Sequence, residues 1–157
     1  MKRLLFLTSI MALLFTFHAN AQDYKTGVGF RGGLSNGLTI KHFTAQDVAL
    51  EGILAFRWGG YHITGLYEKH QPAFDTQQLK FFYGAGGHIG MWDSDQNPWF
   101  DDGTNHTVVG LDGIIGLEYT FREIPFSISA DWKPAFNIVG DTGFWGDEAA
   151  VSIRFTF

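Results

Sequence analysis

TVVGLDGIIGLEYTF, residues 107–121, alternates between two kinds of residue along its whole length. One alternate set is mostly apolar or aromatic, and the other is rich in glycine and carries single charges. The first set includes Val109, Leu111, Ile115, Leu117 and Tyr119, and the second includes Gly110, Asp112, Gly116 and Glu118. A period of two residues indicates a β-strand, and this one is longer than the usual length of about 5–6 residues. The alternation resumes at residues 124–132, after Arg122-Glu123, which predicts a long β-hairpin.

The N-terminus has the pattern of a secretory signal peptide. Lys2 and Arg3 precede an apolar run at residues 4–17, and Ala19-Asn20-Ala21 fits the cleavage site. The run is shorter than the roughly 20 residues that a membrane-spanning helix needs. We therefore expect a cleaved signal peptide at residues 1–21 and a single mature domain at residues 22–157.

The composition limits the classes of function. Loss of Lys2 and Arg3 with the signal peptide lowers the formal charge from −5 to −7, because that segment contains no acidic residue. A negative chain argues against nucleic-acid binding, which needs a basic surface. Cysteine is absent, so neither a disulfide nor a lipidated cysteine is expected. Twenty glycines beside sixteen phenylalanines are unusual for a soluble domain.

Eight segments of the mature chain fit β-strands that are separated by turn-like residues. They are residues 26–34, 37–44, 48–58, 60–70, 79–92, 106–121, 124–136 and 148–157. No helical apolar period occurs after the signal peptide. The expected fold class is all-β, an eight-stranded antiparallel up-and-down β-barrel.

Alternation alone leaves two barrels open: a soluble one with apolar residues inside, and a transmembrane one with apolar residues facing lipid. Glycine on the polar face favours the transmembrane barrel, because glycine weakens a solvated strand but leaves room for large side chains in a narrow lumen. Strands near the 9–11 residues that cross a membrane also favour it. The aromatic girdle expected at the membrane interfaces consists of Trp58, Trp92, Trp132, Tyr119 and Phe121.

The same alternation turns six cations and five anions toward the lumen. They are Arg31, Lys41, Glu51, Arg57, Glu68, Lys80, Asp112, Glu118, Asp131, Lys133 and Arg154. The inside of an eight-stranded barrel is only just wide enough for side chains, and an unpaired buried charge costs several kcal/mol. We therefore expect a lumen filled by an ion-pair network and not an open pore.

The chain resembles the small eight-stranded outer-membrane barrels of Gram-negative bacteria, the OmpA-transmembrane and OmpX-like group. The resemblance rests on the signal peptide, the eight strands, Phe30-Arg31-Gly32-Gly33 and the C-terminal sequence VSIRFTF. It implies a location in the bacterial outer membrane, and it implies that Phe155 and Phe157 form the signal for the barrel-assembly machinery. We expect a monomer in contact with outer-membrane lipid and lipopolysaccharide.

The family contains structural proteins, adhesion factors and lipid A-modifying enzymes, so resemblance alone does not determine the function. The family's lipid A deacylase carries a His-x-Ser pair near its last strands, whereas this chain has Ser127-Ile128-Ser129. We therefore expect no catalytic site, and a structural, envelope-integrity or surface-contact role. A lipid A-modifying enzyme is the alternative, and a narrow small-solute channel is a third hypothesis, suggested by His62 and His88.

The predicted outer loops hold further candidates. Asp93-Ser94-Asp95-Gln96-Asn97 resembles half of a calcium loop, but Pro98 and Thr104 replace the glycine and the glutamate that such a loop requires. Acidic residues suited to bridging lipopolysaccharide through divalent cations are Asp101, Asp102, Asp141, Asp147 and Glu148. Trp99-Phe100 and Phe144-Trp145 fit either a binding surface or a membrane anchor. No histidine spacing fits a metal site, so neither a metal nor a cofactor is expected.

Overall fold

The computed structural model describes residues 24–57, 60–74, 76–92, 106–140 and 142–157. The strands within these ranges are β1 (Thr26–Gly33), β2 (Asn36–Ala45), β3 (Val48–Arg57), β4 (Gly60–Ala73), β5 (Thr76–Trp92), β6 (His106–Thr120), β7 (Phe126–Trp132), β8 (Ala135–Val139), β9 (Gly143–Trp145) and β10 (Ala149–Thr156). No helix in the described part of the chain is long and apolar enough to cross a membrane. The predicted signal peptide lies outside the described residues.

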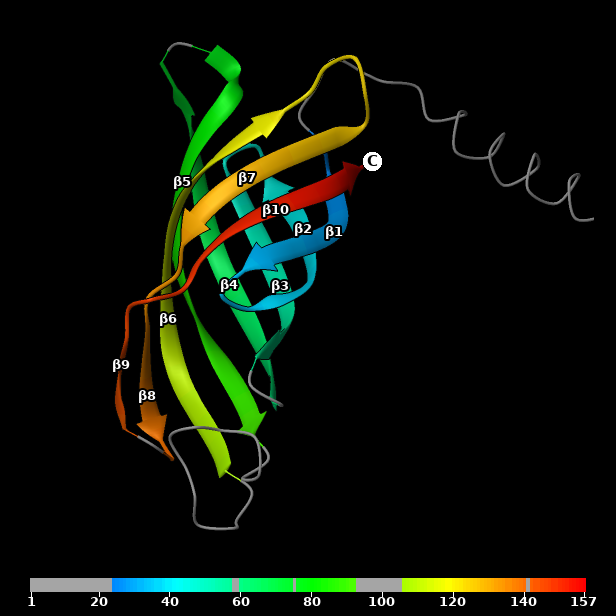
Figure 1. Cartoon of the computed structure of the whole chain (residues 1–157). Coiled ribbons are helices and arrows are strands. Elements are labelled where there is room, and N and C mark those ends of the chain that lie inside the picture. Colours follow the sequence, from blue (N-terminus) through cyan, green and yellow to red (C-terminus); the bar gives the residue numbers. More distant parts are fainter. Residues whose placement is uncertain (1–23, 58–59, 75, 93–105, 141) are drawn as a thin grey trace, which may run out of the picture.

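The strands form one antiparallel sheet that closes on itself (Figure 1). β1 to β6 follow one another around the barrel, and β5 pairs with β6 from Leu79↔Tyr119 to Trp92↔His106. The barrel is closed by β10, which pairs with β1 from Gly27↔Thr156 to Gly33↔Ala150. The predicted all-β, up-and-down, eight-stranded barrel is confirmed.

The ten strands form the eight staves of the barrel, where a stave is one complete crossing of the barrel wall. Each of the last two staves is divided into two strands. β7 and β8 pair with successive parts of β6 and are separated by Lys133-Pro134. β10 and β9 pair with β7 and β8, and residues 146–148 separate them. Pro134 has no N–H group to donate across the sheet. The continuous strand predicted at residues 124–136 is therefore wrong at this point, and β9 has no counterpart among the predicted strands.

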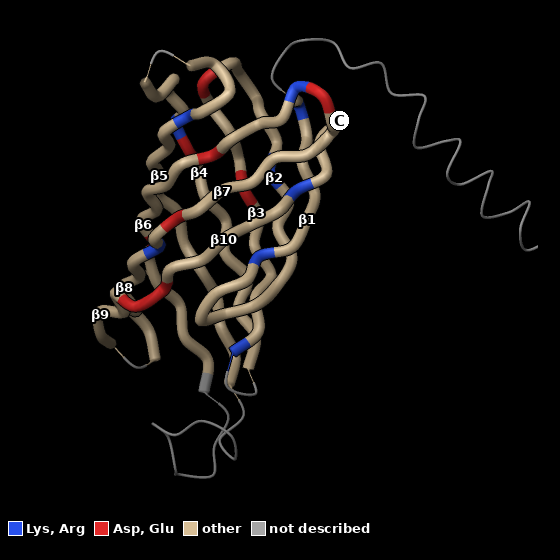
Figure 2. Tube along the Cα trace, turned by 45° about the horizontal axis from the view of Figure 1, so that its top comes forward, with Lys and Arg blue, Asp and Glu red and all other residues tan. Residues whose placement is uncertain are grey.

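Buried and exposed side chains alternate along the staves, and the buried ones are largely polar. On β10, Ser152 and Arg154 are buried, whereas Val151 and Ile153 are about half exposed. Charged residues are spread along the length of the barrel (Figure 2). The polar face therefore lines the lumen, and the apolar face is the outer surface.

One part of the lumen wall is apolar. A buried cluster on β3 to β6 contains Ile53, Ala55, Leu66, Phe82 and Ile114. These side chains occupy inward positions of the same alternation that places charges on the lumen side. The lumen is therefore packed by two kinds of contact, ion pairs and a small hydrophobic core, and β3, β4 and β6 contribute to both.

Inward-facing glycines serve two physical purposes. A Cβ atom on Gly116 would lie 2.6 Å from Phe82 Cζ and 2.7 Å from Asp131 Cβ, so this glycine makes room for lumen side chains. A Cβ atom on Gly86 would lie 2.8 Å from the Gly65 carbonyl carbon and 2.9 Å from Leu66 Cα. There, glycine permits the close approach of a neighbouring backbone in a curved wall. Sequence reasoning anticipated only the first purpose.

Candidate functional site

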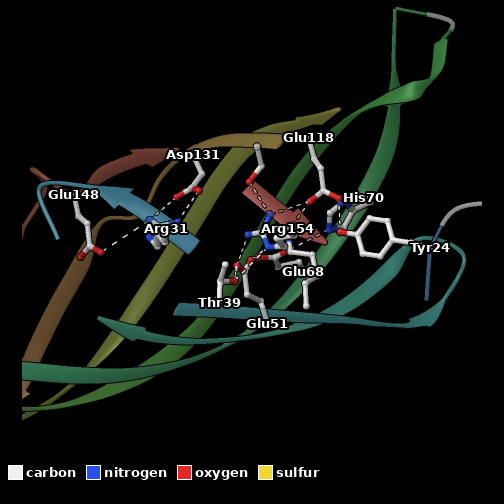
Figure 3. A network of polar contacts seen from close by, with 12 residues as sticks. Tyr24, Arg31, Thr39, Glu51, Glu68, His70, Glu118, Asp131, Glu148 and Arg154 are labelled. Carbon is white, nitrogen blue, oxygen red and sulfur yellow. Dashed lines mark hydrogen bonds and ion pairs between the residues drawn. The ribbon is translucent and has the colours of Figure 1, made fainter. Parts of the chain in front are cut away.

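Lys41 is the centre of an ion-pair cluster in the half of the lumen nearer the C-terminal residue, here called the inner cluster (Figure 3 shows its neighbours). Its ammonium nitrogen lies 2.8 Å from Glu68, 3.1 Å from Glu51 and 3.1 Å from Glu118. Lys41 is on β2, and the three carboxylates come from β4, β3 and β6. All four side chains are almost inaccessible to solvent. One lysine therefore bridges carboxylates from three different strands.

Arg154, on β10, completes the inner cluster. Its guanidinium donates to Glu51 at 2.5 Å and to the Ser129 hydroxyl at 2.8 Å, and it lies 3.5 Å from Glu118. The Thr39 hydroxyl also donates to Glu51. Because a buried charge is stable only with its partners in place, this cluster fixes the relative positions of β2, β3, β4, β6, β7 and β10.

Aromatic side chains cover the inner end of this cluster. The Tyr24 hydroxyl, just before β1, donates to Glu118, and the Tyr24 ring packs edge-on against Phe43 at 5.1 Å. The His70 ring lies 4.8 Å from Phe43 and 5.1 Å from Phe82. Sequence reasoning did not include these residues in the lumen, although Phe43 and His70 share the parity of the inward charges on their strands.

A second cluster, here called the outer cluster, fills the half of the lumen farther from the C-terminal residue. Arg31 donates to both carboxylate oxygens of Asp131, at 2.7 and 2.6 Å. Lys133 lies 2.8 Å from Asp112 and 3.1 Å from Glu148. Glu148, the first residue of the predicted last strand, was grouped with the acidic residues suited to bridging lipopolysaccharide, but it is buried and accepts a hydrogen bond from the Ser35 hydroxyl. That grouping is wrong because Glu148 has the parity of the inward Ser152 and Arg154 and so points into the lumen.

Two histidines lie beside the outer cluster. His88 Nδ1 is 2.7 Å from Asp112, and His88 Nε2 is 3.0 Å from the Asn137 side-chain oxygen. His62 Nε2 is 3.8 Å from Glu148. Each histidine therefore contacts a carboxylate in the lumen, as part of the packed interior.

The structure brings most of the predicted lumen charges into these two clusters. The inner cluster contains Lys41, Glu51, Glu68, Glu118 and Arg154, and the outer one contains Arg31, Asp112, Asp131 and Lys133. Arg57 lies at the outer end of β3, where it donates to Asp147 at 2.8 Å and so lowers the pKa of that carboxyl. The Lys80 nitrogen lies 5.4 Å from the centre of the Phe43 ring.

The predicted girdle residues have different positions. Trp132 is half exposed and donates to the Gly146 carbonyl at 2.7 Å, and the Tyr119 and Phe121 rings lie 4.9 Å apart. The prediction that Trp92 belongs to the aromatic girdle is wrong, because its ring stacks with the buried His62 ring at 6.4 Å. Trp92 has the inward parity of His88, so it faces the lumen and not the outer surface. Trp58 lies outside the described residues.

Phe155 and Phe157, the predicted assembly signal, end the last stave. The Phe155 ring packs against Phe126 at 5.6 Å, and Phe157 is about half exposed. The Phe157 carbonyl accepts the Thr26 N–H at 2.8 Å. The C-terminal residue therefore takes part in closing the barrel against β1.

The outer-loop candidates are only partly described. The calcium-like segment, Trp99-Phe100, Asp101, Asp102 and Asp141 lie outside the described residues. On β9, Phe144 is 69% exposed. Ser129 accepts from Arg154, and Ser127 is buried. Within the described ranges, no group of three or more His, Asp or Glu side chains is arranged to hold a metal ion.

We compared the chain with protein families, curated proteins and solved structures. No protein-family model, no curated protein and no solved structure matches the chain.

Proposed function

We propose that this chain is a non-enzymatic β-barrel of a bacterial outer membrane, with a structural, envelope-integrity or surface-contact role. The observation that carries the proposal is the reversed distribution of side chains. Phe30 is 75% exposed on the outer surface, whereas its neighbour Arg31 is 2% exposed in the lumen. In water such an arrangement would expose the apolar surface and bury the charges, but in a bilayer it places both in favourable surroundings.

The packed lumen supports a structural role over transport. Every carboxylate of the two clusters has a Lys or Arg nitrogen within 3.1 Å. Opening a path for ions would separate these pairs and leave charges without partners in a narrow space, which costs several kcal/mol for each charge. The partners of such a barrel are outer-membrane lipid, lipopolysaccharide and, during insertion, the barrel-assembly machinery.

Conductance measurements test the filled lumen. The mature chain, refolded in detergent and inserted into a planar bilayer, should give little or no steady current. The Gly116→Ala variant, which adds a methyl group to the already filled lumen, serves as a control and should also give no steady current. Large and stable single-channel steps from the wild-type protein would contradict the proposal and support a solute channel.

A second experiment tests the absence of catalysis. The refolded protein is incubated with lipid A, and the acyl chains are analysed by mass spectrometry. We expect an unchanged acyl pattern. Removal or addition of a chain that depends on the folded protein would show that the barrel is a lipid-modifying enzyme.

A further inference from the structure

A groove of about 720 Å³ lies on the outer surface of the barrel, between the end of the β4–β5 hairpin and the face of β5 to β7. Its walls include Phe74, Phe81, Leu117 and Trp132. Phe74, Leu117 and Trp132 are 85%, 41% and 45% exposed, so the groove opens outward and not into the lumen. Pockets of roughly 300–1,000 Å³ hold small ligands or parts of larger ones.

The shape of the groove follows from residue size. Small residues, Ala73, Gly116 and Ala130, alternate around it with bulky apolar ones. Asp131 also borders it, but its carboxylate is turned into the lumen and bound by Arg31. The groove therefore offers no free charge to a ligand, only apolar surface.

Phe74 gives the groove one of its edges. It is the only described residue other than glycine with a positive φ, at 53°. A non-glycine residue in this region is strained, and here it holds a large aromatic ring away from the barrel, 85% exposed. The β4–β5 hairpin thus presents an apolar side chain where a turn would ordinarily present a polar one.

We propose that this groove binds one acyl chain of a phospholipid, an inference that rests on the membrane location proposed above. The groove is continuous with the apolar outer surface through Ile115, Leu117 and Trp132, so hydrocarbon is what surrounds it in a bilayer. The β4–β5 turn lies at the same end of the barrel as the C-terminus (Figure 1). With both chain ends on the periplasmic side of the outer membrane, as this proposal takes them to be, the groove opens to the leaflet that consists of phospholipid.

Two matched substitutions test the groove. Ala130→Phe fills it, whereas Ala85→Phe adds the same volume at another exposed outward position, on β5, that does not line the groove. Wild type and both variants are refolded into vesicles of palmitoyl-oleoyl phosphatidylethanolamine and phosphatidylglycerol. After extraction into mild detergent, native mass spectrometry measures the fraction of barrels that retain a phospholipid.

We expect wild type and Ala85→Phe to retain one phospholipid, and Ala130→Phe to retain about tenfold less, because losing the burial of roughly two methylenes weakens binding by that factor. If Ala130→Phe fails to refold, Ala73→Phe, which fills the groove from the hairpin side, should give the same loss. Equal retention by groove and control variants overturns the inference. So does the absence of retained lipid from wild type that has inserted into the vesicles, a result that leaves the proposed function intact. Failure of the wild type to insert would contradict both proposals.

Discussion

Arg31 and Asp131 show how strongly single side chains are constrained in this barrel. The guanidinium makes two hydrogen bonds to one carboxylate, and both side chains are inaccessible to solvent. Arg31→Met removes one partner and leaves the other charge buried, so we expect a loss of about 3–5 kcal/mol in the free energy of unfolding. Urea unfolding of the vesicle-inserted protein, followed by tryptophan fluorescence, measures the loss.

Two controls separate charge pairing from other effects. The double variant Arg31→Met, Asp131→Leu should be more stable than Arg31→Met alone, because no charge is left unpaired. Asp147→Ala, at the exposed Arg57 pair, should change the stability by less than about 1 kcal/mol. If the double variant were as unstable as the single one, pairing would not be the cause of the loss.

Glycine positions give a second prediction for single residues. Gly116→Ala places a Cβ atom 2.6 Å from Phe82 Cζ and 2.6 Å from the Ala130 carbonyl oxygen, so we expect overpacking to lower the stability by about 1–3 kcal/mol. Gly65→Ala meets no atom within 4 Å and should be neutral or stabilising. The same urea titration compares them. A larger loss from Gly65→Ala would mean that the inner and outer faces are assigned the wrong way round.

At the level of the strand, the energetic cost of a lipid-facing charge should differ along β6 according to its depth in the bilayer. Ile115 is exposed near the middle of the outer surface, and Phe121 follows the inner end of β6. Ile115→Arg should lower the free energy of unfolding by about 2–4 kcal/mol, and Phe121→Arg by about 0–1 kcal/mol. The difference arises because the cost of a lipid-facing charge falls toward the membrane interface. Unfolding in vesicles measures both. Equal costs would contradict a membrane around β6.

Most strands could be predicted from the sequence because alternation records which face is inside. The predicted bounds of the first six strands agree with β1 to β6 within three residues. The last two staves could not be predicted in full. Residues 135–139 continue to alternate after Pro134, so only the pairing with β6 reveals the break. Glu148 opens the predicted strand at residues 148–157 with the parity of Arg154, so its place in the lumen could have been predicted although it was not.

At the level of the whole molecule, alternation predicts which charges enter the lumen but not which ones pair. Arg31 and Asp131 are far apart in sequence and meet only because the closed sheet brings β1 and β7 to opposite sides of β10. The hydrogen bond from Tyr24, just before β1, to Glu118 on β6 also depends on closure. Most charges of the lumen were therefore predictable, but their division into two clusters was not.

The central claim is that hydrocarbon surrounds the apolar outer surface. Folding with and without a membrane tests it most directly. The mature chain is diluted from urea either into vesicles of dilauroylphosphatidylcholine or into buffer alone. We predict that it floats with the vesicles and migrates faster on a gel unboiled than boiled, and that it aggregates in buffer. A monomer that stays soluble in buffer with the same β-sheet circular dichroism would contradict the claim.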